Sequence, residues 1–300
     1  MNSSGQDEHE TLETLFKNID LNIAQQQLIG CIHTTGPGRP PRNTIDVLRS
    51  SIVMRMKAIR SLRELARILD TDTRIRRLCL IKNDERDYTR SVLSRFTVRV
   101  GAEVLQLIIE KVVALLRRTG VGEVDAVLDA AFVKAWSIRN PNDARTGLSD
   151  TDARVGRNGR GYDLGYKLHA SVDPLRILPL ACVMAPANEN EKKHASALVE
   201  RTRMVLGKAE ARLRSLIGDS QYSSNRVRSL VEASVIPYTS NQRGDGLRVD
   251  RWFRTHGPPR LVSEYRKRPM VEALFAFLRT QFGLNVVRVK GLRGSPSTRC

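Results

Sequence analysis

Cysteine is scarce in this sequence and too scattered to build a zinc site. The 300 residues include four cysteines, Cys31, Cys79, Cys182 and Cys300, and no two of them form a Cys-x-x-Cys pair. The five histidines form no His-Glu-x-x-His pattern. We therefore expect reduced thiols rather than disulfides, and a bound metal ion would need oxygen ligands.

Long apolar runs, internal repeats and Walker-type glycine loops are also missing. The longest apolar run, residues 177–185, is interrupted by Pro179 and is far shorter than the ~18 residues that a membrane span needs. The polar N-terminus has no signal-peptide pattern. We therefore expect a soluble cytoplasmic protein without a membrane partner.

Positive charge, in contrast, is in excess. The chain has 50 lysines and arginines against 32 aspartates and glutamates, a net charge of +18, and its pI is about 10.4. The acidic excess is confined to residues 1–30, which hold one basic and five acidic residues. A chain this basic favours a polyanionic partner, and nucleic acid is the first candidate.

The N-terminal part of the sequence reads as an acidic tail, residues 1–37, followed by a helical region, residues 38–120. A basic Gly-Pro-Gly-Arg-Pro-Pro linker at 36–41 cannot continue a helix. Ser61 and Glu64 form a capping box that begins a helix. The other helices are expected over residues 45–60, 89–100 and 102–118.

The helix expected over residues 89–100 is short and basic. Its apolar residues form one stripe, and Arg95 and Arg99 lie beside that stripe. A short basic helix after two others fits a helix-turn-helix-like DNA-binding region. A plain helical bundle with a solvated arginine face is the alternative reading of the same pattern.

From residue 121 onward the pattern changes to strands that alternate with helices. The order β-β-β-α-β-α-β-loop-α predicts an α/β fold, a ribonuclease-H-like mixed sheet flanked by helices, over residues 121–293. Its strands are expected over residues 124–133, 166–172, 177–185, 213–218 and 234–239. Its helices are expected over residues 191–212, 224–232 and after a polar loop that ends near Glu264.

Acidic residues stand at two places where this sheet would bury them. Asp129 lies near the middle of an apolar strand, where an unpaired carboxylate costs several kcal/mol. The strand that ends at Asp219 should lie parallel to it and bring a second carboxylate close, so that a divalent cation is the natural partner. A third acid, Glu272, lies on a narrow polar stripe of the last helix. The stripe also contains Tyr265, Arg268 and Arg279.

The spacing Tyr265-x2-Arg268-x3-Glu272-x6-Arg279 resembles the Tyr-Arg-Glu-Lys signature of the DDE transposases of prokaryotic insertion sequences, in the insertion-sequence-four and -five groups. Arg279 stands where the family usually has lysine, and arginine imposes a planar, forked geometry on its contacts. The likeness covers residues 38–293. It also includes the segments 38–41, 61–69, 127–134, 165–169 with Asp173, 186–188 and 218–222.

This resemblance implies a ribonuclease-H-like catalytic domain in which Asp129, Asp219 and Glu272 match the DDE triad and hold two Mg²⁺ ions, with Mn²⁺ as a substitute. It implies cleavage of double-stranded DNA at the terminal inverted repeats of an insertion sequence, and strand transfer of the 3′-hydroxyl into target DNA. Tyr265, Arg268 and Arg279 would hold DNA phosphates. A homodimer on the DNA and a location on the nucleoid are the further expectations.

Weaker candidates lie near this site. Lys167 and His169 share one strand face and would touch the DNA backbone, or else they are ordinary surface residues. Trp252 would stack on an unpaired base, or else it anchors its loop. Glu191 reads as an acid in the first turn of a helix, favoured there by the macrodipole, rather than as a metal ligand.

A second function remains open for the whole chain. Relatives of this kind usually continue with another helix where this chain has a short tail, residues 294–300. The alternative to an active enzyme is therefore a catalytically inactive or truncated transposase derivative that acts as a DNA-binding protein.

Overall fold

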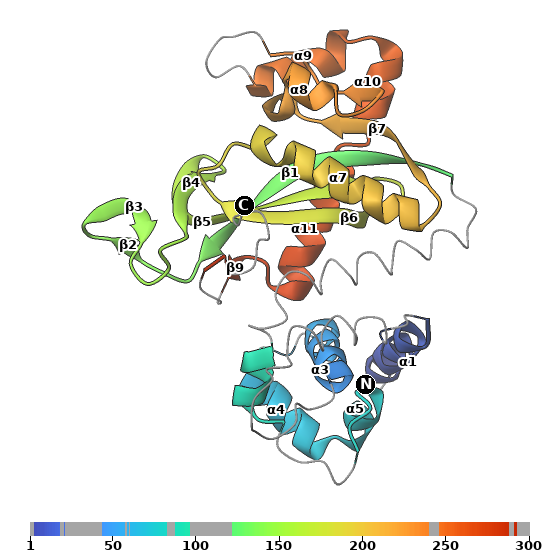
Figure 1. Ribbon diagram of the computed structural model, residues 1–300, viewed down its shortest axis with the longest axis vertical. Helices are drawn as coiled ribbons and strands as arrows, with labels where there is room; N and C mark the ends of the chain where they lie inside the picture. The colour runs from blue at the N-terminus through green and yellow to red at the C-terminus, as the bar shows by residue number, and fades with distance from the viewer. Residues whose placement is uncertain are drawn as a thin grey trace, which may run out of the picture. The chain divides into compact units, whose positions relative to one another are not determined.

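The structure of the chain is a computed structural model, which describes residues 3–18, 21, 44–57, 59, 61–82, 88–96, 122–239, 246–287 and 291–292. The chain divides into two compact units, Met1–Lys111 with Gly294–Cys300 and Val112–Arg293. In their described parts, the first unit contains helices alone and the second contains all of the strands (Figure 1).

The first unit confirms the N-terminal helical region. Ser61 caps its helix as predicted, because its hydroxyl accepts a hydrogen bond from the Glu64 N–H at 3.1 Å. Asp72 then caps a further short helix that follows directly. The helices are α1 (Ser3–Asn18), α3 (Thr44–Met56), α4 (Leu62–Thr71) and α5 (Thr73–Leu78), and residues 90–96 are helical as well.

Two features of this unit bear on the sequence analysis. Helix α1 lies inside the segment that we expected to be an acidic tail, and it buries Leu12 and Phe16. Arg95 is exposed, and its Nε donates to the Ser91 carbonyl on the same helix at 3.3 Å. Arg99, the helix expected over 102–118 and the linker at 36–41 lie outside the described residues.

The second unit has a central sheet that confirms the ribonuclease-H-like prediction. The strands follow the spatial order β6-β5-β1-β7-β8, in which the first three are antiparallel neighbours and the last three are parallel. This is the mixed sheet that three consecutive antiparallel strands and two parallel crossovers produce. The strands are β1 (Glu123–Ala135), β5 (Gly161–Asp173), β6 (Leu178–Pro186), β7 (Arg212–Gly218) and β8 (Ala233–Val235).

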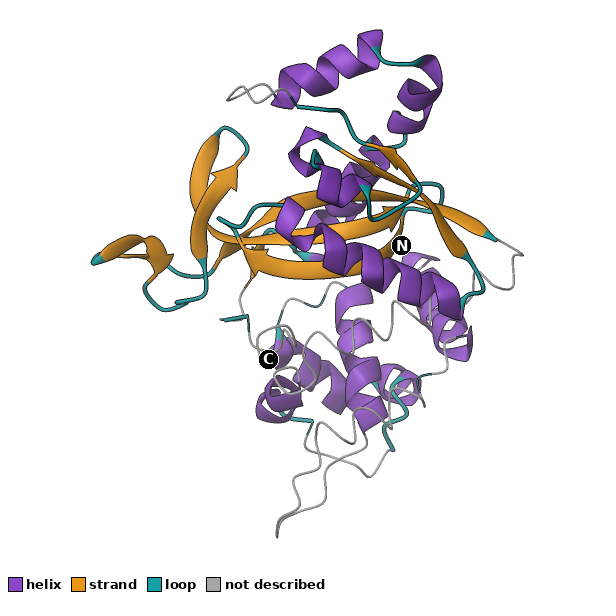
Figure 2. Ribbon diagram, turned by 45° about the horizontal axis from the view of Figure 1, so that its top comes forward, coloured by secondary structure: helices purple, strands orange, loops and turns teal. Residues whose placement is uncertain are grey.

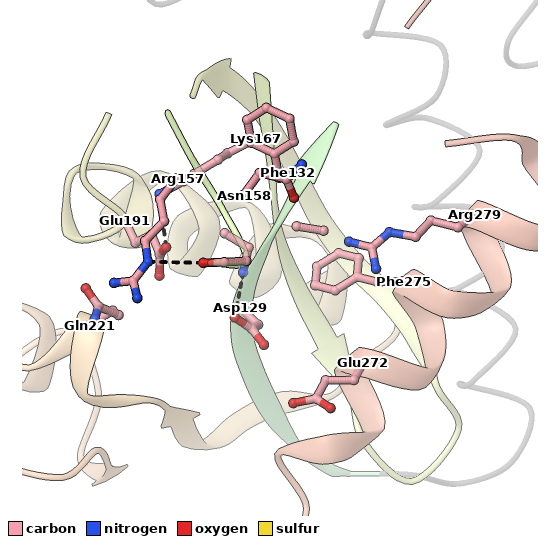
Figure 3. Close-up of a pocket in the computed structure, with 13 residues that line it drawn as sticks. Asp129, Phe132, Arg157, Asn158, Lys167, Glu191, Gln221, Glu272, Phe275 and Arg279 are labelled. Atoms are coloured by element: carbon pink, nitrogen blue, oxygen red, sulfur yellow. Dashed lines mark hydrogen bonds and ion pairs between the residues drawn. The ribbon is translucent and has the colours of Figure 1, made fainter. Parts of the chain in front are cut away.

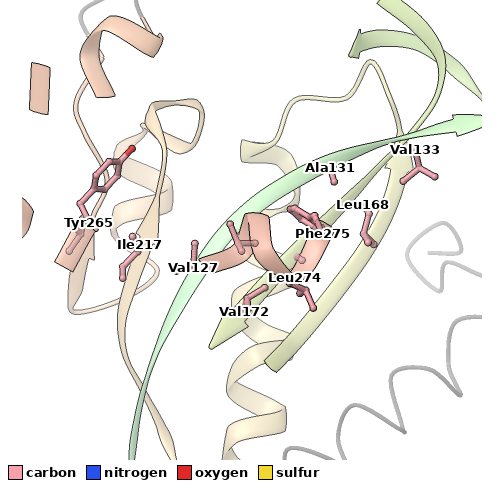
Figure 4. Close-up of a cluster of buried hydrophobic side chains, with 12 residues drawn as sticks. Val127, Ala131, Val133, Leu168, Val172, Ile217, Tyr265, Leu274 and Phe275 are labelled. Carbon is pink, nitrogen blue, oxygen red and sulfur yellow. The ribbon is translucent and has the colours of Figure 1, made fainter. Parts of the chain in front are cut away.

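Helices cover both faces of this sheet (Figures 1 and 2). Helix α7 (Lys192–Lys208) lies on one face, where its Thr202 donates a hydrogen bond to Ser171 of β5 at 2.8 Å. Helix α11 (Pro269–Phe282) packs Leu274 and Phe275 on the other face, against Val127 and Ala131 of β1 (Figure 4). The apolar core therefore fixes where the first turn of α11 meets the sheet.

Several elements differ from the prediction. The polar segment expected to be a loop contains α9 (Gly246–His256) and α10 (Pro259–Tyr265). Helix α8 (Asn225–Arg228) is shorter than expected. The strands β2 (Arg139–Asn140), β3 (Asp143–Gly147), β4 (Arg154–Asn158) and β9 (Val286–Val287) are additional, and η2 (Ser220–Tyr222) is a single 3-10 turn. Among the described residues, no helix combines the length and the apolar character needed to cross a bilayer.

Candidate active site

The parallel pairing of β1 and β7 brings the two predicted aspartates together. Leu128 of β1 pairs with Gly218, the last residue of β7. The next residues along the chain are Asp129 and Asp219. Oxygen atoms of these two carboxylates and of Glu191 all lie within 4.8 Å of one another. The three side chains are largely buried, with exposed fractions of 12%, 14% and 15%. We call Asp129, Asp219 and Glu191 the acidic cluster.

Burial makes the negative charge of this cluster costly. Burial raises the pKa of Asp129 to about 6, and burial together with the charge of Asp129 raises the pKa of Asp219 to about 6. Burial and the charge of Asp219 also raise the pKa of Glu191. Each shift means that the local environment does not fully compensate the carboxylate charge.

Two cations form the ion pairs of these carboxylates in the described part of the chain. The Arg268 Nη2 atom lies 3.2 Å from Asp129 Oδ2 and 3.6 Å from Asp219 Oδ2, and its Nη1 atom lies 3.6 Å from Glu272 Oε1. The Lys167 Nζ atom lies 3.2 Å from Glu191 Oε1. Arg268 stands at the junction of α10 and α11 and so joins the last helix to the strand aspartates.

Glu272 lies beside the cluster rather than in it. Its side chain is 62% exposed, and it projects from the first turn of α11 into a cleft of about 550 Å³ that Asp129 and Glu191 also line (Figure 3). The structure thus brings Asp129 and Asp219 together with Glu191 and leaves Glu272 on the cleft wall. Further residues of the cleft wall are Arg157, Asn158, Lys167, Gln221, Phe275 and Arg279.

Two of the residues expected to contact DNA are buried, which corrects those expectations. Tyr265 is 1% exposed, because it ends helix α10 and packs edge-on against Phe253 at a ring distance of 5.3 Å. His169 is fully buried, because α7 covers its strand face and places His194 4.4 Å from its ring. Neither side chain reaches the surface in this structure.

The remaining sequence candidates keep access to solvent. Arg279 lines the cleft and is exposed, and Lys167 lines it while paired with Glu191. Trp252 is 59% exposed on α9 and stacks on His256 at 5.2 Å.

Glu191 is the residue that the sequence analysis undervalued. It stands at the N-cap position of α7, but its side chain makes no capping hydrogen bond. Its carboxylate instead turns toward Lys167 and the two aspartates. The available signal was its position, directly after a Pro-Ala-Asn turn at the end of a buried strand.

Two family models match the sequence of this chain. Residues 123–295 match the Transposase DDE domain, and residues 3–99 match a Transposase domain (DUF772). The chain belongs to the DDE transposase family. The two matches together confirm the predicted relationship to insertion-sequence transposases.

Solved transposase structures are also similar to this transposase, at low identity. The Mos1 transposase paired-end complex with left transposon end is 11% identical, with 89% of this chain and 95% of that chain covered and a TM-score of 0.24. The Mos1 mariner paired end complex with Mn is 9% identical, with 91% and 98% covered and a TM-score of 0.23. Comparison with curated proteins found no match. Membership of the family therefore rests on the family models.

Proposed function

We propose that this transposase cleaves DNA at the ends of an insertion sequence and transfers the freed 3′-hydroxyl into target DNA. The observation that carries the proposal is a group of buried carboxylates within 4.8 Å of one another, in a cleft that also presents Arg157, Lys167 and Arg279. Acidic and basic side chains on the wall of one cleft suit a site that must hold both metal ions and a phosphodiester backbone.

The donor set fits a hard divalent cation. All the candidate ligands are carboxylate oxygens, which suit Mg²⁺ or Mn²⁺ rather than zinc. Burial raises the pKa values of Asp129 and Asp219, and a bound cation would offset the cost of their buried charges. We propose that Asp129, Asp219 and Glu272 hold two Mg²⁺ ions, which when bound supply Lewis acidity to the attacking and the leaving oxygen.

The basic side chains have a different task, which is to hold the DNA. Arg268 has three weak carboxylate contacts rather than one tight pair, so a DNA phosphate can replace them. Arg279 and Lys167 flank the same cleft and would fix the backbone in it. Trp252 offers an exposed ring that a base can stack on.

This assignment also indicates the partners of the protein and the part of the chain that would bind each of them. Double-stranded DNA, as terminal inverted repeats and as target, would bind residues 38–120 and the catalytic domain, residues 121–293, with Arg95 and Arg99 among the N-terminal contacts. We further propose that the protein acts as a homodimer that joins two ends on nucleoid DNA.

A nicking assay tests this proposal. We expect Mg²⁺-dependent nicking of a duplex that carries the element's inverted repeat, and a loss of at least ~100-fold in Asp129→Asn, because the ion-binding carboxylate is gone. Asp163→Asn is the matched control, since Asp163 pairs with Lys134 and is not among the residues of the cleft wall. Wild-type protein that binds this duplex without cutting it would instead favour the DNA-binding derivative.

A further inference from the structure

We infer that Glu191 is a direct ligand of the metal site, a fourth carboxylate in addition to Asp129, Asp219 and Glu272. The inference rests on the proposed function, because it assumes that the site binds divalent metal. It goes beyond the triad, since the sequence signature assigns no metal to this residue.

The geometry favours Glu191 over Glu272 as the near neighbour of the two aspartates. Oxygens of Glu191, Asp129 and Asp219 lie within 4.8 Å of one another, so one divalent ion can contact all three after small side-chain rotations. Glu191 is 15% exposed, whereas Glu272 is 62% exposed and is joined to the aspartates through Arg268. Glu191 therefore lies closer than Glu272 to the place that a ligand of such an ion would occupy.

Glu191 is also not committed to another structural task. An acid at the start of a helix ordinarily accepts a hydrogen bond from the helix N–H groups, and this one accepts none. In the described part of the chain its one side-chain partner is Lys167, on Oε1 at 3.2 Å. The second carboxylate oxygen, Oε2, remains available for coordination.

The hydroxyl of Tyr222 gives an independent indication. Tyr222 lies on the 3-10 turn that follows Asp219 and is fully buried, and its hydroxyl has no hydrogen-bond partner among the described residues. Tyr222 lies three residues after Asp219, and burial and the charges of Glu191, Asp129 and Asp219 raise its pKa. A buried hydroxyl without a hydrogen-bond partner destabilises the folded chain. At this place it is a ready donor to a ligand oxygen of the metal site.

Metal titration of the full-length protein, stripped with EDTA, tests the inference. We expect Glu191→Gln to weaken Mn²⁺ binding, measured by calorimetry, by about 10- to 100-fold, the range seen when groups around a metal are lost. Glu191→Asp should weaken it less, because the charge is kept on a shorter side chain. Glu189→Gln is the matched control and should leave Mn²⁺ affinity unchanged, since Glu189 pairs with Lys193 and His194.

The outcomes separate the inference from the proposed function. Wild-type Mn²⁺ affinity in both Glu191 variants overturns the inference, makes Glu191 a counterion of Lys167, and leaves the transposase proposal intact. Absence of Mn²⁺ binding in the wild type overturns the metal site as a whole. A parallel melt with and without Mn²⁺ gives a second readout. The Mn²⁺-induced rise in melting temperature should shrink in Glu191→Gln, and a full rise in that variant overturns the inference.

Discussion

Two buried aspartates lie four residues apart on the same face of β1, and their surroundings are opposite. Asp125 is held by the Arg214 Nε and Nη2 atoms at 2.7 and 2.6 Å, by Ser215 at 2.7 Å and by Lys267 at 2.8 Å. Burial alone would raise its pKa, but the hydrogen bonds from Arg214, Lys267 and Ser215 outweigh burial and lower it.

Asp129 is also buried, but it receives far less compensation for its charge. One oxygen accepts a hydrogen bond from the Ala130 N–H at 2.8 Å, and the other meets Arg268 at 3.2 Å. Burial therefore dominates and raises its pKa to about 6. The contrast separates a structural carboxylate, whose charge the folded chain compensates, from the carboxylate that we propose to hold metal, whose charge the folded chain compensates only in part.

The largest expected effect of this difference is on stability. Asp125→Asn should lower the free energy of unfolding by about 2–3 kcal/mol, because it breaks a buried ion pair whose cation Arg214 is still half-exposed. Asp129→Asn should leave that free energy unchanged or raise it by about 1 kcal/mol, because it removes an undercompensated charge. Chemical denaturation near pH 7.5 in EDTA measures both values.

An equal loss of stability in both variants would remove the distinction between the two aspartates. Ser215→Ala serves as the control for Asp125→Asn, since it removes one hydrogen bond and leaves both cations. It should cost about 1 kcal/mol.

The second expected effect is the pH dependence of stability. Folding raises the pKa of Asp219 from 3.8 to about 6, so its stabilising contribution is present below pH ~3.8 and is lost as the pH rises through about 6. Asp219→Asn mimics the protonated form. It should therefore raise the free energy of unfolding near pH 7.5 by about 1–2 kcal/mol and raise the melting temperature with it, and this gain should vanish near pH 4.

Asp125 is the control for that measurement, because its pKa is shifted in the opposite direction. Because its pKa is lowered, its contribution is complete above pH ~4 and is lost only below it. The penalty of Asp125→Asn should therefore stay constant between about pH 5 and 8. Melting curves of both variants and the wild type, recorded in EDTA at several pH values, test this pH dependence. A pH-independent effect of Asp219→Asn would contradict the prediction.

The fold was predictable because its signals are local and strong. The alternation around Tyr166–Val172 and the apolar run around Asp129 indicate strands, and β5 and β1 follow. The parallel pairing that joins Asp129 to Asp219 came from the order of elements alone, and it is confirmed. Helices α9 and α10 were missed because their segment was read as a polar, basic loop.

The site was predictable only where chemistry and topology coincide. Asp125 and Asp129 lie in the same apolar run. Their neighbours in the sequence do not indicate which aspartate pairs with two cations and which pairs with one. That depends on Arg214 and Lys267, which are ~90 and ~140 residues away and approach only in the folded chain. Burial of His169 and Tyr265 was missed for the same reason, since the covering helices are distant in sequence or were read as loop.

The smallest expected effect concerns two adjacent cations, Lys267 and Arg268. Lys267 is committed to Asp125 and to Glu264, whereas Arg268 has contacts of 3.2 to 3.6 Å and an Nε atom without a hydrogen-bond partner among the described residues. Arg268 is therefore the one able to turn to a phosphate. Arg268→Gln should weaken binding of inverted-repeat DNA about 3- to 10-fold in EDTA and reduce the slope of affinity against salt by about one.

Lys267→Gln is the matched variant for this comparison. It removes the same charge one residue away, but that charge is already neutralised by Asp125, so DNA affinity and salt slope should stay at wild-type values. Fluorescence anisotropy at several salt concentrations measures both quantities, and melting curves confirm that each variant is folded. An equal loss of affinity in the two variants would mean that DNA senses only net charge. A loss confined to Arg268→Gln identifies the cation that the acidic cluster releases to the substrate.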